Sequence, residues 1–469
     1  MFFMDFKFFL LMPILFVVYW LIPVRMNWLK KMFLLVASYM LYVNFNPAYA
    51  LLLLAISLIT FWGAKLLEKD MICVRGGKVV AVVALMPLLI FKYYNFINES
   101  VFSFLSLFHL RFQLPGLNWA IPVGISFFTF QALGYYLDVY HKRIPVEKNL
   151  VDYLLFVSFF PQIASGPISK ASELLPQIKS LAPFSYDKAA RGCRYFLWGL
   201  FLKIAVADRA GLYVALVLDH YQNFSGLNCL FASFMYSLQI YADFAGYSFM
   251  AIGTAKLLGF DLINNFNHPY FSMSVTDFWR RWHISLSRWL KDYVYIPLGG
   301  NRCSKARNYL NIMATFLVSG IWHGANWTFI LWGLIHGLCQ VIEKAFGLQK
   351  SESKGLIRFA RVLGTFLIVS FAWILFRSPT VADAFNVVQQ ITTLYKGFNI
   401  SMEGVEMLAY LAVAFVPFAL FEIIHEFYKD FYHAIMCRVR VRWCVYIALL
   451  SLIILIGVFD GSEFIYANF

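Results

Sequence analysis

Long apolar segments separated by short basic clusters run through the whole chain, and this pattern limits the folds that it can adopt. Of the 469 residues, 61% are hydrophobic and only 14% are charged. A soluble chain of this length could not keep so much apolar surface out of water, so we predict an all-α polytopic membrane protein. The apolar segments cover residues 6–22, 32–45, 47–64, 79–98, 101–110, 120–140, 150–166, 192–218, 228–258, 309–320, 323–346, 360–376, 405–425 and 443–459.

Several of these segments are shorter than the roughly 20 residues that a helix needs to cross a bilayer. We therefore predict about eleven transmembrane helices within one integral-membrane domain (1–469), with the short segments as re-entrant or interfacial helices. Pro122, Gly124 and Pro161 interrupt apolar segments. An interrupted backbone at membrane depth is tolerated only where it lines a cavity or is buried in protein.

The formal net charge of +14 is concentrated in the loops, for example in residues 141–148, 302–307 and 438–442. This distribution is typical of the positive-inside rule, and it predicts contact with membrane lipid and not with nucleic acid. A surface for an anionic substrate is compatible with it. Basic residues follow the first apolar segment and precede the last one, so both chain termini are predicted to be external.

Two regions differ from the rest of the chain. Residues 261–308 are rich in Trp, Tyr, Asn and Arg and lack a long apolar stretch, which predicts a cytoplasmic-side interfacial or re-entrant segment over the mouth of a cavity. Residues 460–469 form an aromatic C-terminal tail. The tail is either an anchor in the aromatic belt of the membrane or a segment that folds back into an external cavity and presents the hydroxyl of Tyr466.

Three histidines are candidates for catalysis. His323, which we expect at the start of a long apolar helix, is suited to general-base chemistry near neutral pH. His283 could orient or polarise a carbonyl group. His336 is a second-tier candidate, because on one straight helix it would lie about 20 Å along the axis from His323. The alternative for His323 is a histidine that hydrogen-bonds a neighbouring helix, and the alternative for His283 is one that faces lipid headgroups.

Arg280, Arg281 and Arg288 could bind the phosphates of a donor substrate, since guanidinium groups match phosphate oxygens, or they could contact lipid headgroups. We expect no metal and no bound cofactor. The pair His425–Glu426 begins a zinc-hydrolase pattern, but position 429 is Lys. The seven cysteines are scattered and form no metal-binding or redox pair.

Three motifs resemble the membrane-bound O-acyltransferase (MBOAT) family: WRRWHISLS at 279–287, YVYIPLGGN at 293–301 and SGIWHG at 319–324. Further pieces, at 122–131, 160–168 and 241–247, occur in the family's order. Within the family the chain looks most like the membrane subunits of bacterial alginate O-acetylation.

The resemblance implies about eleven spans and re-entrant helices around a through-membrane tunnel, with His323 as the catalytic histidine and His283 as the second polar residue. It implies acetyl-CoA as the cytosolic donor. It also implies transfer across the bacterial inner membrane to an extracytoplasmic alginate-like polysaccharide, through a periplasmic SGNH-like acetyltransferase partner. The tail is similar to the aromatic motif of a D-alanylation accessory peptide, which makes Tyr466 a possible acyl relay, although Ala467 and Asn468 depart from that motif.

Two alternatives remain. The same fold could transfer D-alanine from a carrier protein to teichoic acid. A transporter for a polysaccharide precursor would explain the apolar segments, but it would leave the paired histidine motifs unexplained.

Overall fold

The computed structural model describes residues 3, 5–44, 46–69, 71, 74–110, 113–163, 166–350, 353–459 and 465. These residues form helices and connecting segments and contain no strand, which confirms the predicted all-α class. The helices form two compact units, which are described separately. The first unit holds Met1–Cys193 and Ala251–Ile263, and the second holds Arg194–Met250 and Asn264–Tyr466. The single domain 1–469 stays a prediction.

Buried hydroxyl and amide groups connect the helices of the first unit. Tyr153 and Thr60 share a hydrogen bond of 2.6 Å, and the Tyr136 hydroxyl donates to the Gly77 carbonyl at 2.7 Å. An ion pair of 2.8 Å joins Lys31 to Asp152. The helices of this unit are α1 (Phe6–Leu21), η1 (Val24–Met26), α2 (Asn27–Val43), α3 (Pro47–Glu68), α4 (Val74–Ser106), α5 (Ile125–Tyr140), α6 (Leu150–Ser158), α7 (Phe160–Ile163), α8 (Ala171–Lys179) and the first part of α9 (Tyr186–Phe201).

The second unit contains all three candidate histidines. Its helices after α9 are the π-helical turn η2 (Leu202–Ala207), α10 (Asp208–Leu218), η3 (Tyr221–Asn223), α11 (Gly226–Leu257, whose last turns belong to the first unit), η4 (Pro269–Phe271), α12 (Val275–Arg281), α13 (Ile284–Leu290), the π-helical turn η5 (Lys291–Tyr295), α14 (Lys305–His323), α15 (Trp327–Ala345), η6 (Leu348–Lys350), α16 (Gly355–Arg377), α17 (Val381–Ile391), η7 (Leu394–Lys396), α18 (Met402–Phe427), α19 (Lys429–Met436) and α20 (Val439–Ile456).

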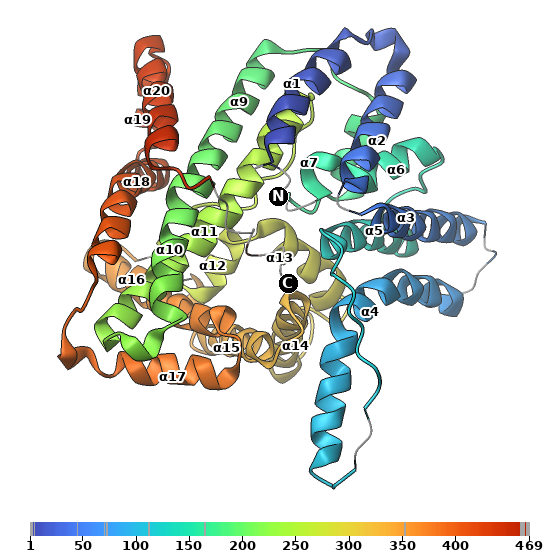
Figure 1. The fold of residues 1–469 in the computed structure, drawn as a ribbon. Helices are drawn as coiled ribbons and strands as arrows, with labels where there is room; N and C mark the ends of the chain where they lie inside the picture. Colours follow the sequence, from blue (N-terminus) through green and yellow to red (C-terminus); the bar gives the residue numbers. More distant parts are fainter. Residues whose placement is uncertain are drawn as a thin grey trace. The chain divides into compact units, whose positions relative to one another are not determined.

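Helices α14 and α15 lie side by side as a hairpin (Figure 1). Their backbones approach closely because glycine occupies both sides of the contact. A Cβ atom at Gly320 would lie 2.3 Å from the Phe329 carbonyl oxygen, and one at Gly333 would lie 2.4 Å from the Phe316 carbonyl oxygen. Any larger residue would therefore push the two helices apart.

The expectation that His323 begins a long helix is wrong, because His323 is the last residue of α14. The chain turns at Gly324, which is fully extended (φ −171°), and the side chain of Asn326 caps α15 by accepting the Thr328 N–H at 3.0 Å. His336 therefore lies on the second arm of a hairpin, and the separation of about 20 Å that we expected along one straight helix does not apply.

Among the described residues, five helices are long and apolar enough to cross a membrane: α18, α20, α16, α3 and residues 75–106 of α4. In the described part of the chain, α1 and α2 together form a sixth candidate, bent by 103°. In α20 only 11% of the apolar window is buried, so most of its side chains are left for contact with lipid. The chain is thus a multi-pass membrane protein, and the count of about eleven spans stays a prediction.

The segment 261–308 contains the short helices η4, α12, α13 and η5, together with the first turn of α14. Helices α12 and α13 have seven residues each and η5 has five, so none of them can span a bilayer. Their placement at the cytoplasmic interface stays a prediction. Of the aromatic tail, the structure describes only Ile465; Tyr466 lies outside the described residues.

The glycine contact between α14 and α15 makes Gly333→Ala destabilising. Because the added methyl group meets the backbone of the other helix, we expect a loss of about 1–3 kcal/mol in unfolding free energy and a lower apparent melting temperature, measured by tryptophan fluorescence in detergent. The matched control is Gly364→Ala in α16, where a Cβ atom meets no other atom within 4 Å. An equal melting temperature for the two variants would contradict this role of the glycine contact.

Candidate functional site

The second unit brings His283, His323 and His336 together with Trp322 and Trp332. We call these five aromatic residues the histidine cluster. All three imidazole rings are buried. The Trp332 ring centroid lies 4.8 Å from that of His323 and 4.9 Å from that of His336. The Trp322 ring lies 4.9 Å from His323 and 6.0 Å from His283. The hairpin thus places His323 and His336 against the same indole.

His283 occupies a strained position between two short helices. Its backbone is left-handed, with φ 43° and ψ 55°, which is uncommon for a residue other than glycine. Asn265 holds this corner, because its carbonyl accepts the Ile284 N–H at 2.9 Å and its side chain accepts the Ser285 N–H at 3.2 Å. Burial lowers the pKa of His283 to about 3, so its imidazole is neutral at pH 7.

His336 is committed to a neighbouring indole. The Trp279 Nε1–H donates to His336 Nδ1 at 3.3 Å, which uses the lone pair of that nitrogen. This bond assigns the proton of the neutral ring to Nε2. The contact favours a packing role for His336, in which it fixes the orientation of Trp279.

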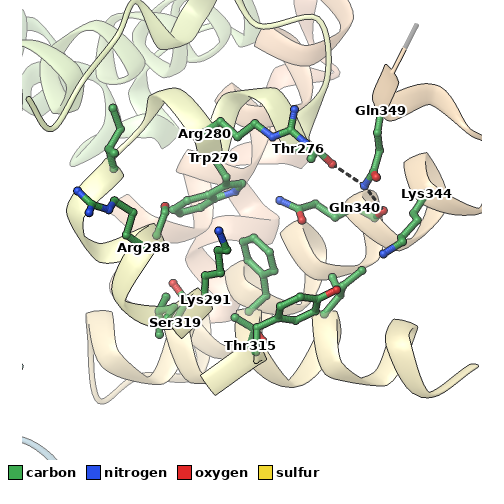
Figure 2. A pocket seen from close by; sticks show the side chains of 16 residues that line it. Thr276, Trp279, Arg280, Arg288, Lys291, Thr315, Ser319, Gln340, Lys344 and Gln349 are labelled. Atoms are coloured by element: carbon green, nitrogen blue, oxygen red, sulfur yellow. Dashed lines mark hydrogen bonds between the residues drawn. The ribbon is translucent and has the colours of Figure 1, made fainter. Parts of the chain in front are cut away.

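Trp279 forms one wall of a cavity of about 470 Å³ that is built by α12, α13, η5, α14 and α15. Four basic side chains and no acidic one line it, and Figure 2 shows Arg280, Arg288 and Lys291 gathered around Trp279, with Lys344 on another side. The other polar lining residues are Thr276, Ser287, Thr315, Ser319, Gln340 and Gln349. A cavity with this lining has the electrostatic character of an anion-binding site.

Two of the three arginines predicted to bind the donor line this cavity, namely Arg280 and Arg288. Arg281 is not among the lining residues. Its guanidinium group pairs with Glu426 at 2.8 Å and with Asp277 at 3.2 Å. Consecutive residues of a helix point about 100° apart, so Arg280 faces the cavity while Arg281 faces α18.

A carboxylate on α15 fixes the position of α12 beside the cavity. Glu343 accepts the backbone N–H groups of Val275 and Thr276 at 2.5 and 2.9 Å, and it also accepts the Thr276 hydroxyl at 2.7 Å. A negative charge at the N-terminus of a helix is favourable because the first N–H groups have no partner within the helix. Glu343 therefore sets the direction in which Arg280 projects.

Ser319 connects the cavity to the histidine cluster. It lines the cavity and precedes His323 by four residues on α14, so the two side chains lie on one face of the helix, about 6 Å apart along its axis. Helix α14 thus carries a buried imidazole and also lines a cationic cavity. This arrangement is suited to proton transfer next to a bound anionic substrate.

Reasoning from the sequence missed several polar residues of the second unit. Lys344 and Gln349 line the cavity, and Lys344 donates to Asn308. Lys203, Asp208 and Asp243 form a buried ion cluster. Charged residues inside the apolar segments 192–218 and 228–258 were the signal that could have revealed this cluster, since such residues are rare in membrane segments. The described residues contain no group of three or more His, Cys, Asp or Glu side chains placed to hold a metal ion.

Comparisons with known proteins agree on one family. Residues 83–376, more than half of the chain, match the model of the membrane-bound O-acyltransferase family. The chain is 35% identical over 424 residues to a probable alginate O-acetylase AlgI of Pseudomonas aeruginosa, covering 87% of this chain and 79% of that protein. It is 34% identical over 398 residues to a peptidoglycan O-acetyltransferase of Helicobacter pylori, covering 78% and 74%. A teichoic acid D-alanyltransferase of Streptococcus thermophilus is 30% identical over 244 residues, covering 49% and 58%. The chain is therefore an acyltransferase that belongs to the membrane-bound O-acyltransferase family.

Proposed function

We propose that this acyltransferase moves an acetyl group from cytosolic acetyl-CoA across the bacterial inner membrane for O-acetylation of an extracytoplasmic, alginate-like polysaccharide. The observation that carries the proposal is that α14 both lines the cationic cavity and carries the buried His323. The O-acetylating relatives, which match 78–87% of the chain, support acetyl as the acyl group and a glycan as the final acceptor.

The cavity would hold the phosphate-bearing part of the donor. Coenzyme A carries several phosphate charges, and the forked donors of Arg280 and Arg288 suit phosphate oxygens, while Lys291 and Lys344 add positive charge. Arg281 pairs with Glu426 and Asp277 and is not among the residues that line the cavity, so it has a weaker claim to donor binding.

In the proposed reaction His323 accepts the proton of an acceptor hydroxyl, and the oxygen attacks the thioester carbonyl carbon. The new C–O bond forms an ester, the C–S bond breaks, and the imidazolium returns its proton to the coenzyme A thiolate. His283 positions or polarises the thioester carbonyl. Both imidazole rings are buried, and neutral imidazole is the form in which His323 can take a proton.

Tyr466 is the proposed first acceptor. Its ester would pass to a periplasmic SGNH-like acetyltransferase partner and from there to the polysaccharide. The external C-terminus predicted from the basic residues before α20 supports this direction of transfer.

D-alanyl transfer to teichoic acid is the second candidate, because the teichoic acid D-alanyltransferase of S. thermophilus matches 49% of this chain. The longer match to the O-acetylating relatives favours acetyl transfer. Offering acetyl-CoA and a D-alanyl carrier protein to reconstituted vesicles separates the two. Membership of an acyltransferase family makes a polysaccharide-precursor transporter the weakest alternative.

Replacing the proposed base tests the mechanism directly. We expect His323→Ala to lower kcat for acetyl transfer by about 10²–10⁴-fold, because the acceptor hydroxyl loses its general base. The measurement is transfer of radiolabelled acetyl from acetyl-CoA in vesicles, with His220→Ala, an exposed histidine, as the control. A normal kcat in His323→Ala would remove this residue from the chemistry.

The donor site predicts a different kinetic signature. Arg288→Ala should raise KM for acetyl-CoA about tenfold with a smaller effect on kcat, because it removes a phosphate contact made in the ground state and the transition state alike. The matched control is Arg307→Ala, an exposed arginine in the first turn of α14. Equal KM values for the two variants would argue against the cavity as the donor site.

The relay predicts a covalent intermediate. Intact-mass analysis after incubation with acetyl-CoA should show one added acetyl group that is absent from Tyr466→Phe, and this variant should lose polysaccharide acetylation. Tyr428→Phe, at an exposed tyrosine after α18, is the control and should behave as wild type. Full polysaccharide acetylation by Tyr466→Phe would exclude the relay.

A further inference from the structure

The ion cluster of Lys203, Asp208 and Asp243 is buried in the second unit and has no part in the proposed chemistry. Lys203 Nζ lies 2.7 Å from Asp208 Oδ1 and 2.8 Å from Asp243 Oδ1, and all three side chains are at most 2% exposed. One ammonium group between two carboxylates leaves an excess of one negative charge. Because buried carboxylate oxygens are costly without hydrogen-bond donors, the cluster requires donors in addition to Lys203.

One such donor comes from the C-terminal segment of the chain. The backbone N–H of Ile465 donates to Asp243 Oδ2 at 2.9 Å. Lys203 pairs with the other oxygen, Oδ1. A backbone N–H that binds a carboxylate makes a charge-assisted bond, which is stronger than a bond between neutral groups. Asp243 thus pairs with Lys203 through Oδ1 and binds the C-terminal segment through Oδ2.

The π-helical turn η2, which carries Lys203, makes a second contact with the same segment. In this turn the Asp208 N–H bonds to the Lys203 carbonyl, five residues back, and not to the carbonyl of Ile204 as in an α-helix. The Ile204 carbonyl instead accepts the Val458 N–H at 3.0 Å. The Arg209 side chain, one residue beyond the cluster, donates to the carbonyl of Ile456, the last residue of α20.

A close contact between α9 and α11 holds the two sides of the ion cluster together. A Cβ atom at Gly199 would lie 2.5 Å from the Gly246 carbonyl oxygen. Gly199 precedes Lys203 by one helical turn, and Gly246 follows Asp243 by one turn. The ammonium and carboxylate groups are therefore held together by a helix contact that does not involve the C-terminal segment.

We infer that η2 and Asp243 form a docking site for the C-terminal segment of this chain, in which the Asp243 carboxylate positions Ile465. Three contacts carry the inference: Arg209 with Ile456, Ile204 with Val458, and Asp243 with Ile465. The consequence for acyl transfer rests on the proposed function. Because Tyr466 follows Ile465 directly in the sequence, an anchored Ile465 limits the distance that the Tyr466 hydroxyl can travel.

The test is amide hydrogen–deuterium exchange of the full-length protein in lipid nanodiscs, with Asp243→Ala compared to Asp208→Ala. Each variant removes one of the two carboxylates that pair with Lys203, but only Asp243→Ala removes the acceptor of the Ile465 N–H. We expect Ile465 exchange to become about tenfold faster in Asp243→Ala and to stay near the wild-type rate in Asp208→Ala. The Val458 N–H, whose acceptor is the Ile204 carbonyl, is the internal reference and should keep its rate in both variants.

Unchanged Ile465 exchange in Asp243→Ala, or equal acceleration in the two variants, would overturn the docking site. Should Asp243→Ala fail to fold, Asp243→Asn keeps the shape and offers a neutral, weaker acceptor, for which we expect acceleration of about threefold. An unchanged Ile465 rate in that variant would likewise overturn the inference.

Acetyl transfer measured on the same preparations separates the docking site from the proposed function. Faster Ile465 exchange together with reduced transfer supports both. Faster exchange with wild-type transfer leaves the docking site standing and shows that acyl transfer does not need an anchored Ile465.

Discussion

The close backbone contact between α14 and α15 is the constraint on which the candidate site depends. Because Gly320 and Gly333 leave no room for side chains between the two helices, His323 at the end of one arm and His336 within the other pack against the same Trp332 ring. The hairpin also supplies residues from both of its arms to the wall of the cavity. A shift of one arm would therefore change the surroundings of the imidazoles and the shape of the cavity together.

Several polar groups of this apolar protein are paired with a partner inside the fold. Glu343 binds the N-terminus of α12, Asn265 binds the first N–H groups of α13, and Glu426 lies between Arg281 and Arg358. Each contact satisfies a donor or a charge that would be costly to leave unpaired in the interior. The same contacts orient α12 and α13, and these helices carry the arginines and flank His283. One set of hydrogen bonds and ion pairs thus supplies partners for buried polar groups and also positions the site.

The sequence predicted the all-α membrane class and the family, because apolar segments and long motifs are local signals. It did not predict the hairpin. The SGIWHG motif appeared to introduce a helix, whereas Gly324 and the Asn326 cap end one helix and begin another. Nor could it predict that Arg280 lines the cavity while Arg281 pairs with Glu426, since this difference follows from the direction of a short helix packed against α15. The ion pairing of Lys203 with Asp243 joins residues far apart in the chain, so no local pattern indicates it.

Two contacts of the same kind organise the polar groups of the second unit. Gly320 and Gly333 each precede a histidine of the cluster by about one turn, and Gly199 and Gly246 lie one turn from Lys203 and Asp243. Residues three or four apart share a helix face, so a side chain one turn from a glycine contact points toward the neighbouring helix where the two backbones are closest. At such a point a polar group is shielded from lipid and has partners on both helices. Close glycine contacts therefore provide the places where this apolar protein can keep buried histidines, and the carboxylate that binds Ile465, away from the hydrocarbon.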